Sequence, residues 1–210
     1  MTHISRRSVL GLSAAVAVAP LTATLPARAT TAAQGFGNDA WALVVDRYPQ
    51  QSSWNSATDV PRTGYLVDAD PEHPNPRVYR SFFRVPVPGL AGTSVSAASL
   101  TLLLTRSYTA TQTPVELFHV RDLDPSQAVT WENTNSTETW LTSLGVAFGA
   151  VRPPQPPQVL SFGGSAATAV VQEAAAQGKE FLTFGLRNPN ETAIAHQKTY
   201  GAYSLTLMVD

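Results

Sequence analysis

Cysteine is absent from this chain of 210 residues, and charged residues are scarce, at 14% of the composition. Without cysteine there is no disulfide framework, no thiolate metal site and no cysteine nucleophile. Average soluble proteins contain about 25% charged residues, so this chain is poor in charge. Its 14 lysines and arginines do not exceed its 15 aspartates and glutamates, which argues against a duplex-DNA-binding protein. The hydrophobic share of 43% is ordinary and supports a globular domain rather than a disordered chain.

The first 29 residues have the features of an export signal. Arg6 and Arg7 precede an apolar stretch at 9–19, and the Ala-Arg-Ala sequence at 27–29 has the small-x-small pattern that signal peptidases cleave. The arginine pair resembles a bacterial twin-arginine signal, while the general secretory route stays open as the alternative. The apolar stretch is shorter than the ~20 residues that span a bilayer, so no membrane span is expected in the mature protein. We therefore expect a secreted bacterial protein with a flexible leader at 30–39.

From residue 40 onward, apolar and polar residues alternate with a period near two, which is typical of strands rather than helices. β-branched and aromatic residues fill these segments, and proline, glycine, asparagine and aspartate separate them. Strands at this spacing predict an all-β fold, a jelly-roll β-sandwich formed by residues 40–210 as one domain. The clearest strand segments are 40–45, 78–85, 99–105, 114–120, 180–186 and 203–209.

One segment breaks the period-two pattern. Residues 165–177 are rich in alanine and are followed by Gly178, which suits a left-handed helix cap. They predict one short crossover helix of about three turns on the surface of the sandwich, with Ser165 capping its first turn. The prolines at 152–157 predict a local polyproline connection.

Several short sequences occur in an order that matches a known family. They include Arg-Ser-Phe-Phe-Arg at 80–84, Thr-Trp at 130–131 and Thr-Phe-Gly-Leu-Arg-Asn-Pro-Asn-Glu at 183–191. Together they resemble the DNRLRE-domain family of secreted actinobacterial domains, and the likeness covers nearly all of 40–210. The resemblance implies a jelly-roll fold related to carbohydrate-binding modules, with a polysaccharide or a cell-wall surface as the partner. Two departures concern the ligand: cysteines carried by many relatives are absent, and Gln197-Lys198 stands where relatives often have Trp-Lys.

No catalytic constellation is visible in the sequence. His73, His119 and His196 are scattered without metal-ligand spacing, and His119 lies in a strand segment where a half-buried structural imidazole is expected. There is no G-x-S-x-G nucleophile elbow and no phosphate-binding loop. A pair of acids for glycoside hydrolysis stays open, because the distance between side chains cannot be read from the sequence. We expect a protein that is not an enzyme and requires no cofactor.

Aspartates in two loops are candidate ligands for a structural calcium ion. Asp68 and Asp70 could supply carboxylate oxygens together with Glu72, and so could Asp122 and Asp124. Neither loop matches the twelve-residue EF-hand pattern. Asp68 and Asp70 are the predicted calcium ligands, and solvated loop acids are the alternative interpretation.

Aromatic rings in polar segments are the candidate glycan-binding residues, because the C–H edges of sugars lie on flat aromatic faces. Trp54 stands in a polar segment where no strand pattern would bury it, with Tyr48 and Tyr65 nearby, and Trp140 follows a loop rich in hydroxyl and amide groups. These four residues form the predicted glycan site, while packing of Trp54 against the edge of the sandwich is the alternative. Trp131 is expected in the core.

Charge adds two further expectations. Arg80, Arg84 and Arg187 are expected to face outward from strands, where they would form ion pairs or contact acidic sugars. Removal of residues 1–29 takes away three arginines and no acid, which leaves 11 basic against 15 acidic residues and a net charge of −4. That balance favours a neutral glycan or a protein surface over nucleic acid.

The leading functional hypothesis is a secreted non-catalytic module that binds a polysaccharide or a cell-wall surface. It depends on the export signal, the family resemblance and the lack of a visible catalytic constellation. The alternative is an extracellular structural or adhesion protein with no sugar site, and an unrecognised hydrolase is the third hypothesis.

Overall fold

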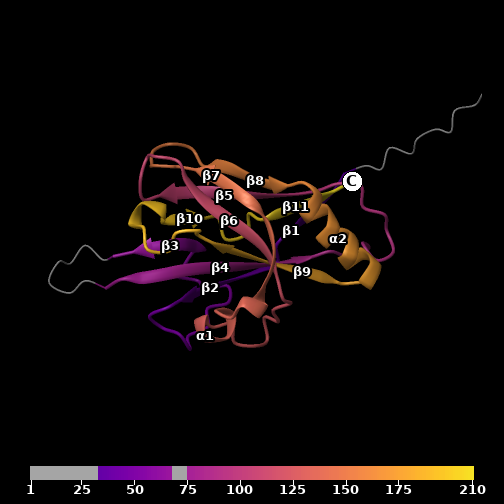
Figure 1. Ribbon diagram of the computed structural model, residues 1–210, viewed down its shortest axis with the longest axis horizontal. Helices are drawn as coiled ribbons and strands as arrows, with labels where there is room; N and C mark the ends of the chain where they lie inside the picture. Colours follow the sequence, from indigo (N-terminus) through magenta and orange to yellow (C-terminus); the bar gives the residue numbers. More distant parts are fainter. Residues whose placement is uncertain (1–32, 68–74) are drawn as a thin grey trace, which may run out of the picture. The chain divides into compact units, whose positions relative to one another are not determined.

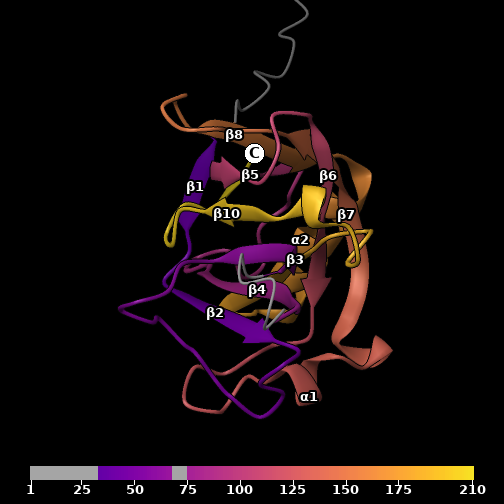
Figure 2. The same ribbon diagram turned by 90° about the vertical axis from the view of Figure 1, so that its left-hand side faces the viewer.

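The computed structural model describes residues 33–67 and 75–210 and shows two antiparallel β-sheets packed as a sandwich (Figure 1). Figure 2 shows the two layers, with β5 and β8 in one and β2 and β4 in the other. The first layer, sheet A, contains β1 (Gln34–Gly37), β11 (Thr206–Val209), β5 (Ala98–Ser107), β8 (Gln158–Gly163) and β10 (Lys198–Tyr200). The second layer, sheet B, contains β2 (Ala40–Val45), β4 (Arg77–Pro86), β9 (Phe181–Arg187), β6 (Thr113–Val120) and β7 (Trp140–Gly149).

One strand joins the two sheets. β3 (Arg62–Leu66) pairs with β10 through its first residues and with β4 through its last. Gly64 makes this change of partner possible: its φ is +89°, and a Cβ there would lie 2.9 Å from the carbonyl oxygen of His196. Along the chain, consecutive strands mostly alternate between the sheets, as in a jelly roll. The predicted all-β jelly-roll sandwich is confirmed.

The main core lies between the sheets and follows the alternation predicted from the sequence. Leu100, Leu102 and Leu104 of β5 point inward and are at most 1% exposed, while the residues between them lie on the outer face. They belong to the same cluster as Phe83 of β4 and Phe184 of β9, in the opposite sheet. Burial of each such side chain contributes roughly 1.5–3 kcal/mol to folding.

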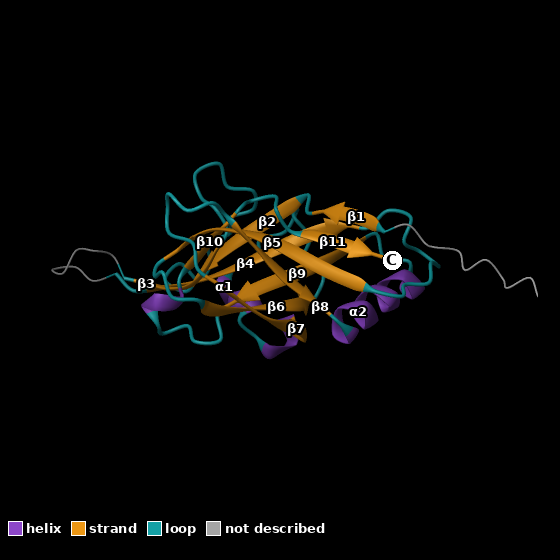
Figure 3. Ribbon diagram, turned by 90° about the horizontal axis from the view of Figure 1, so that it is seen from above, coloured by secondary structure: helices purple, strands orange, loops and turns teal. Residues whose placement is uncertain are grey.

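The predicted crossover helix is present with the predicted bounds. α2 (Ser165–Gln177) connects β8 of sheet A to β9 of sheet B and lies at one end of the sandwich (Figure 3). Gly178 ends it in the left-handed conformation, as predicted. Ser165 does not cap it, because Gly164 occupies the cap position and makes no side-chain bond. The helix also buries Val171, among others, in the main core instead of lying on the surface.

Two expectations about connecting segments need correction. Part of the leader expected at 30–39 belongs to the sandwich, because β1 pairs with β11 and Phe36 is buried in the main core. The expected polyproline connection at 152–157 begins with a turn in which the Gln155 N–H donates to the Arg152 carbonyl oxygen.

The predicted export signal at 1–29 lies outside the described residues. Within the described ranges, no helix is both long enough and apolar enough to cross a membrane.

The outer face of sheet B carries a second, smaller hydrophobic cluster, here called the outer cluster. It consists of Ala42, Val44, Phe82, Phe118, Val120, Leu123 and Val129. The segment between β6 and β7 contributes to this cluster and contains α1 (Trp131–Thr134) and the 3-10 helix η1 (Thr137–Thr139) (Figure 1). A reciprocal capping box fixes the start of α1: the Thr130 hydroxyl accepts from the Asn133 N–H, and the Asn133 side chain accepts from the Thr130 N–H. The segment between β6 and β7 therefore packs over the outer face of sheet B and helps to bury the outer cluster.

Candidate functional site

Trp54 and Trp140, two of the four predicted glycan-binding residues, pack against the outer cluster. The Trp54 indole N–H donates to the Gln127 carbonyl oxygen at 3.0 Å. The Trp140 ring lies 5.4 Å from the ring of Phe82, and its indole N–H donates to the Thr134 carbonyl oxygen at 2.9 Å. Both rings are half-buried, and both N–H groups bond within the fold. This geometry makes the two tryptophans anchors of the covering segments, and their role in glycan binding stays a prediction.

Arg80 does not face the solvent as predicted; only 8% of it is exposed. Its guanidinium lies 4.1 Å from the ring centroid of Trp131, which is itself half-buried against the outer cluster. It donates to both carboxylate oxygens of Glu191 at 2.7 Å and to the Asn135 side-chain oxygen at 2.8 Å. The prediction that Arg80 is exposed to solvent is wrong because the segment between β6 and β7 packs over the outer face of sheet B. The alternation of residues along a strand does not indicate whether another segment packs over one of its faces.

Arg84 and Arg187 are half-buried on the same sheet. Arg84 forms the predicted kind of ion pair, with Asp39 at 2.6 Å, and its guanidinium lies 4.2 Å from the ring centroid of Phe181. The Arg187 guanidinium lies 4.2 Å from the ring centroid of Phe118. Both side chains are therefore engaged with neighbouring side chains of the fold.

The predicted calcium ligands Asp68 and Asp70 lie outside the described residues. In the second candidate loop, Asp122 pairs with Lys179 at 2.8 Å. Asp124 accepts a hydrogen bond from the backbone N–H two residues further on, which lowers the pKa of this carboxyl group. The described ranges contain no group of three acidic or histidine side chains placed to hold a metal ion. A calcium site at Asp68 and Asp70 stays a prediction.

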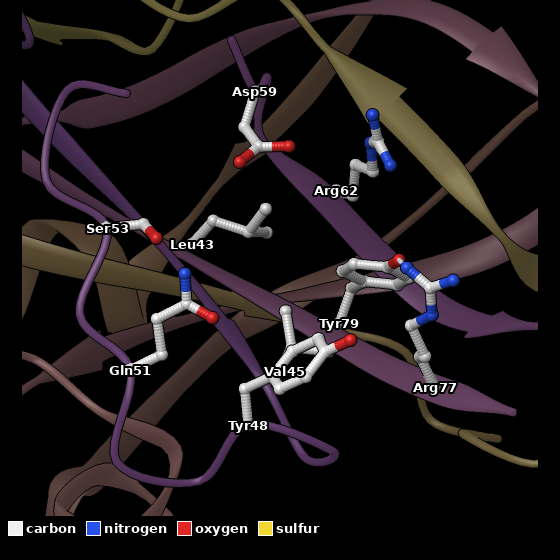
Figure 4. A pocket seen from close by; sticks show the side chains of 9 residues that line it. All are labelled: Leu43, Val45, Tyr48, Gln51, Ser53, Asp59, Arg62, Arg77 and Tyr79. Atoms are coloured by element: carbon white, nitrogen blue, oxygen red, sulfur yellow. Dashed lines mark hydrogen bonds between the residues drawn. The ribbon is translucent and has the colours of Figure 1, made fainter. Parts of the chain in front are cut away.

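Tyr48, the third predicted glycan residue, lines a pocket of about 170 Å³, here called the tyrosine pocket. Figure 4 shows the side chains around it: Leu43, Val45, Tyr48, Gln51, Ser53, Asp59, Arg62, Arg77 and Tyr79. Tyr48 is 44% exposed, whereas Tyr79 is buried. The guanidinium of Arg62 lies 5.6 Å from the Tyr79 ring centroid, and Arg77 donates to the Tyr79 hydroxyl at 3.5 Å. Aromatic faces, an amide, a carboxylate and two guanidinium groups therefore surround one small cavity.

The loop after β2 forms one wall of the tyrosine pocket, and hydrogen bonds to neighbouring strands hold it there. Asp46 follows β2, and its carboxylate accepts from the backbone N–H of Val78 in β4 at 2.7 Å. Further along the loop, the Ser53 carbonyl oxygen accepts from the Leu43 N–H at 3.1 Å. Tyr48 lies between these two attachments, so its ring is presented by an anchored loop.

A larger groove of about 820 Å³, here called the arginine groove, adjoins the tyrosine pocket at Arg62, which lines both. Arg152 donates to the Tyr108 carbonyl oxygen at 2.6 Å, and Tyr108 is 45% exposed. Tyr65, the remaining predicted glycan residue, lines neither cavity. Three of the groove's described lining residues are arginines and none is acidic; they are Val60, Arg62, Leu66, Arg106, Ser107, Tyr108, Arg152, Pro153, Gln197 and Thr199.

Two histidines lie outside the tyrosine pocket and the arginine groove. His119 lines a separate cavity of about 200 Å³ beside α2. Its Nε2 atom is buried without a hydrogen-bond partner, and burial, followed by the charge of Lys179, lowers its pKa. His196 ends the 3-10 helix η2 (Ile194–His196), and its Nδ1 lies 2.9 Å from the side-chain oxygen of Asn188. Burial also lowers the pKa of His196.

The sequence interpretation missed the arginines that line the two cavities. Arg62 begins β3, Arg106 is near the end of β5, and Arg152 follows β7. Each lies at or near the end of a strand, but no local sequence pattern indicates that these three strand ends share one groove. No protein-family model matches the chain, and no curated protein matches it.

Proposed function

We propose that this chain is an exported, non-catalytic β-sandwich module that binds an acidic polysaccharide or a cell-wall surface bearing one. The observation that carries the proposal is the arginine groove, whose described lining contains Arg62, Arg106 and Arg152 and no carboxylate. The export signal predicted at 1–29 and the resemblance to DNRLRE domains add support.

The chemistry of the two cavities suits an acidic sugar chain. A planar guanidinium donates paired hydrogen bonds to a carboxylate, sulfate or phosphate group. Tyr48 and Tyr108 offer exposed ring faces for the C–H edges of sugar rings. Gln51 and Asp59 can exchange hydrogen bonds with hydroxyl groups. The net charge alone favoured a neutral glycan; the concentration of arginines favours an anionic one.

The lining of the cavities also supports binding rather than hydrolysis. Among the described residues that line the two cavities, none is a histidine and Asp59 is the one carboxylate. Most glycoside hydrolases use two carboxyl groups on opposite sides of the bond that breaks. A single carboxylate beside arginines and tyrosines can bind a sugar chain but does not supply the two carboxyl groups of that mechanism.

Calorimetric titration of the purified protein with a soluble polyuronate, and with a neutral glucan of matched length, tests the proposal. We expect binding to the polyuronate only, and weaker binding as salt is raised, because salt screens exposed charges beyond about 8–10 Å. Arg106→Gln should weaken binding up to about fivefold, since one exposed ion pair contributes up to about 1 kcal/mol.

Arg121→Gln is the matched control. Arg121 is exposed, donates to the Asn133 carbonyl oxygen at 2.8 Å and does not line the groove. It should leave the affinity unchanged. Equal affinities of the Arg106→Gln variant and the parent protein, or equal binding of the neutral glucan, contradict the proposal.

A structural or adhesion role without a sugar site is the second candidate, and exposed apolar side chains on two neighbouring strands favour it. Val146 and Phe148 on β7 and Val159 on β8 are 46%, 57% and 60% exposed. Large apolar groups gathered on a surface commonly mark protein contacts. Sedimentation over a range of protein concentrations tests this candidate. The structural role is favoured over the proposed glycan-binding module if the protein binds no glycan, self-associates, and loses that self-association in the Phe148→Ser variant.

A further inference from the structure

Three residues of the arginine groove form a row across adjacent strands. β10 lies between β3 and β5 (Figure 2). Thr199 of β10 pairs with Arg62 of β3 on one side and with Arg106 of β5 on the other, and all three residues line the groove. Residues that pair directly across antiparallel strands have their side chains on the same face of the sheet. Arg62, Thr199 and Arg106 are here called the β10 row.

The residues next to the β10 row show that it faces outward. Lys198, the neighbour of Thr199 in β10, pairs with Thr63 of β3 and with Ser107 of β5. These three neighbours are at most 2% exposed. Successive residues of a strand point to opposite faces of the sheet, so the β10 row lies on the solvent side.

A β-bulge in β5 gives Arg106 its outward orientation. The inward leucines of β5 end at Leu104, and simple alternation would turn Arg106 inward as well. The pairing with β10 shifts by one residue at this point, which leaves Thr105 without a partner in β10. The Thr105 hydroxyl donates to the Thr199 carbonyl oxygen at 3.0 Å and holds the bulge against β10. The alternation of β5 therefore changes phase, and Arg106 lies on the outer face beside Thr199.

No described acid balances the charges of the two arginines in the β10 row. Neither Arg62 nor Arg106 belongs to an ion pair among the described residues, although Asp59 shares the tyrosine pocket with Arg62. Neighbouring strands lie about 4.8 Å apart, so the backbones of the two arginines are about 10 Å apart, with Thr199 between them. Two side chains of this length can lean over Thr199 and reach the same anionic group. An anion there would also remove the repulsion between the two cations.

We infer that one acidic group of the bound polysaccharide lies over Thr199, between Arg62 and Arg106. Each guanidinium donates to an oxygen of the acidic group, and the Thr199 hydroxyl donates a further hydrogen bond. Tyr108, which is 45% exposed in the same lining, offers its ring face to a sugar unit. This inference rests on the proposed function and adds to it the position of the acidic group and a further binding residue, Thr199.

A carboxylate introduced into the β10 row tests the inference. Thr199→Glu places an acid between the two arginines, where it should pair with them and exclude the acidic group of a ligand. In calorimetric titration with the soluble polyuronate, this variant should bind about ten- to twentyfold more weakly than the parent protein, because two exposed contacts of up to about fivefold each are lost. Thr199→Gln has the same size without the charge. It should weaken binding no more than about threefold, since its amide can still donate to the acidic group.

Thr101→Glu is the matched control for the change in net charge. Thr101 lies on the outward face of β5 between Thr206 of β11 and Ser161 of β8, and it does not line the groove. It is about 17 Å along the strand from Arg106, which exceeds the screening length of about 8–10 Å. The affinity of this variant for polyuronate should stay within about twofold of that of the parent protein.

Thermal unfolding gives a second readout, which a disruptive substitution would not produce. Thr199→Glu should unfold about 2–4 °C above Thr101→Glu, because its carboxylate is placed between two cations and the control's is not. Both variants replace threonine by glutamate in the middle of three paired strands, so the cost in β propensity is similar. Adding Arg106→Gln to Thr199→Glu should reduce the difference.

The outcomes distinguish this inference from the proposed function. If the parent protein binds no acidic glycan, the proposed function itself is wrong. If polyuronate binds the parent protein and Thr199→Glu equally well, or if Thr101→Glu weakens binding as much, the acidic group does not lie over Thr199 and the inference is overturned. Equal losses in Thr199→Gln and Thr199→Glu also overturn it, because they show an effect of size rather than of charge.

Arg62→Gln keeps the inference testable if Thr199→Glu fails to fold. This variant removes one of the two cations of the β10 row and should weaken polyuronate binding up to about fivefold. Unchanged affinity in this variant overturns the inference, and the Arg121→Gln control should again bind like the parent protein.

Discussion

Lys198 gives the sharpest test of the energetics of this fold, because a charged ammonium is buried without an acidic partner in the part of the chain described. The residue is 0% exposed on β10, and its ammonium donates to the Thr113 hydroxyl. None of the ion pairs in the described residues includes it. Burial lowers the pKa of Lys198 from its ordinary value of 10.5 to about 8. Removing the charge should therefore stabilise the protein.

The pH dependence has a definite sign. Below pH 8, Lys198 is protonated in both states, and the folded state bears the cost of the buried charge. Between about pH 8 and 10.5 the folded state loses the proton while the unfolded state keeps it, so stability rises with pH. Using these two pKa values, the free energy of unfolding should increase by about 2 kcal/mol between pH 7.5 and 9.5. Tyr200 sets the upper limit: burial raises its pKa, so its contribution opposes folding once the unfolded phenol ionises above pH 10.

Lys198→Met is the perturbation, and urea unfolding followed by tryptophan fluorescence at several pH values is the assay. The variant should lose the rise between pH 7.5 and 9.5 and should be more stable than the parent protein at pH 7 by about 1–3 kcal/mol. Lys179→Met is the control, because Lys179 is partly exposed and paired with Asp122, so the rise with pH should persist in this variant. A parent protein whose stability is flat over this range, or a Lys198→Met variant that keeps the rise, would refute the reasoning.

Three further substitutions probe the packing of sheet B, each measured by urea unfolding. Arg80→Met should lower the free energy of unfolding by about 3–5 kcal/mol, because it leaves the Glu191 carboxylate without its bidentate partner. The double variant with Glu191→Gln should recover part of this loss. Losses that add up in the double variant would contradict the coupling of the two side chains. Gly185→Ala should cost about 1–3 kcal/mol or more, since its Cβ would lie 2.7 Å from a tryptophan ring, whereas Gly37→Ala, with nothing within 4 Å, should be tolerated. Trp54→Ala should cost about 3–5 kcal/mol yet leave polyuronate affinity of the folded protein unchanged; a loss of affinity would restore this ring as a binding platform.

The sequence pattern was sufficient for the sheets and the helix because both depend on short-range periodicity. Alternate leucines in β5 predict an inward face, and the alanine-rich stretch ending at Gly178 predicts α2; the structure has both. Periodicity distinguishes the two faces of a strand but does not tell which of them another segment covers. Arg80 and Trp140 show the consequence. The covering segment follows β6, so the cluster that buries this arginine depends on contacts between residues far apart in the sequence.

The arginines of the groove could not be predicted for a related reason. Arg62, Arg106 and Arg152 come from separate parts of the sequence. They meet because Arg62 of β3 and Arg106 of β5 both pair with Thr199 of β10, and the segment after β7 bonds to the end of β5 through the Ser107 N–H and the Val151 carbonyl oxygen. Each arginine alone resembles an ordinary exposed residue at a strand end. Local sequence offers no rule that places three such ends on one groove, whereas the sandwich topology does.

Net charge and local charge favour different ligands, because net charge is a sum over a molecule larger than the range of the interaction. At physiological salt a charge is screened beyond about 8 Å, so a bound anionic group responds mainly to the charges within that distance. The lining of the arginine groove contains three cations, and none of them is paired with a described acid. The excess of acids elsewhere slows the approach of a polyanion, and it does so most at low salt. For the proposed acidic ligand, we therefore expect the charge of the whole chain to affect the rate of encounter, and the charges within the groove to affect the affinity.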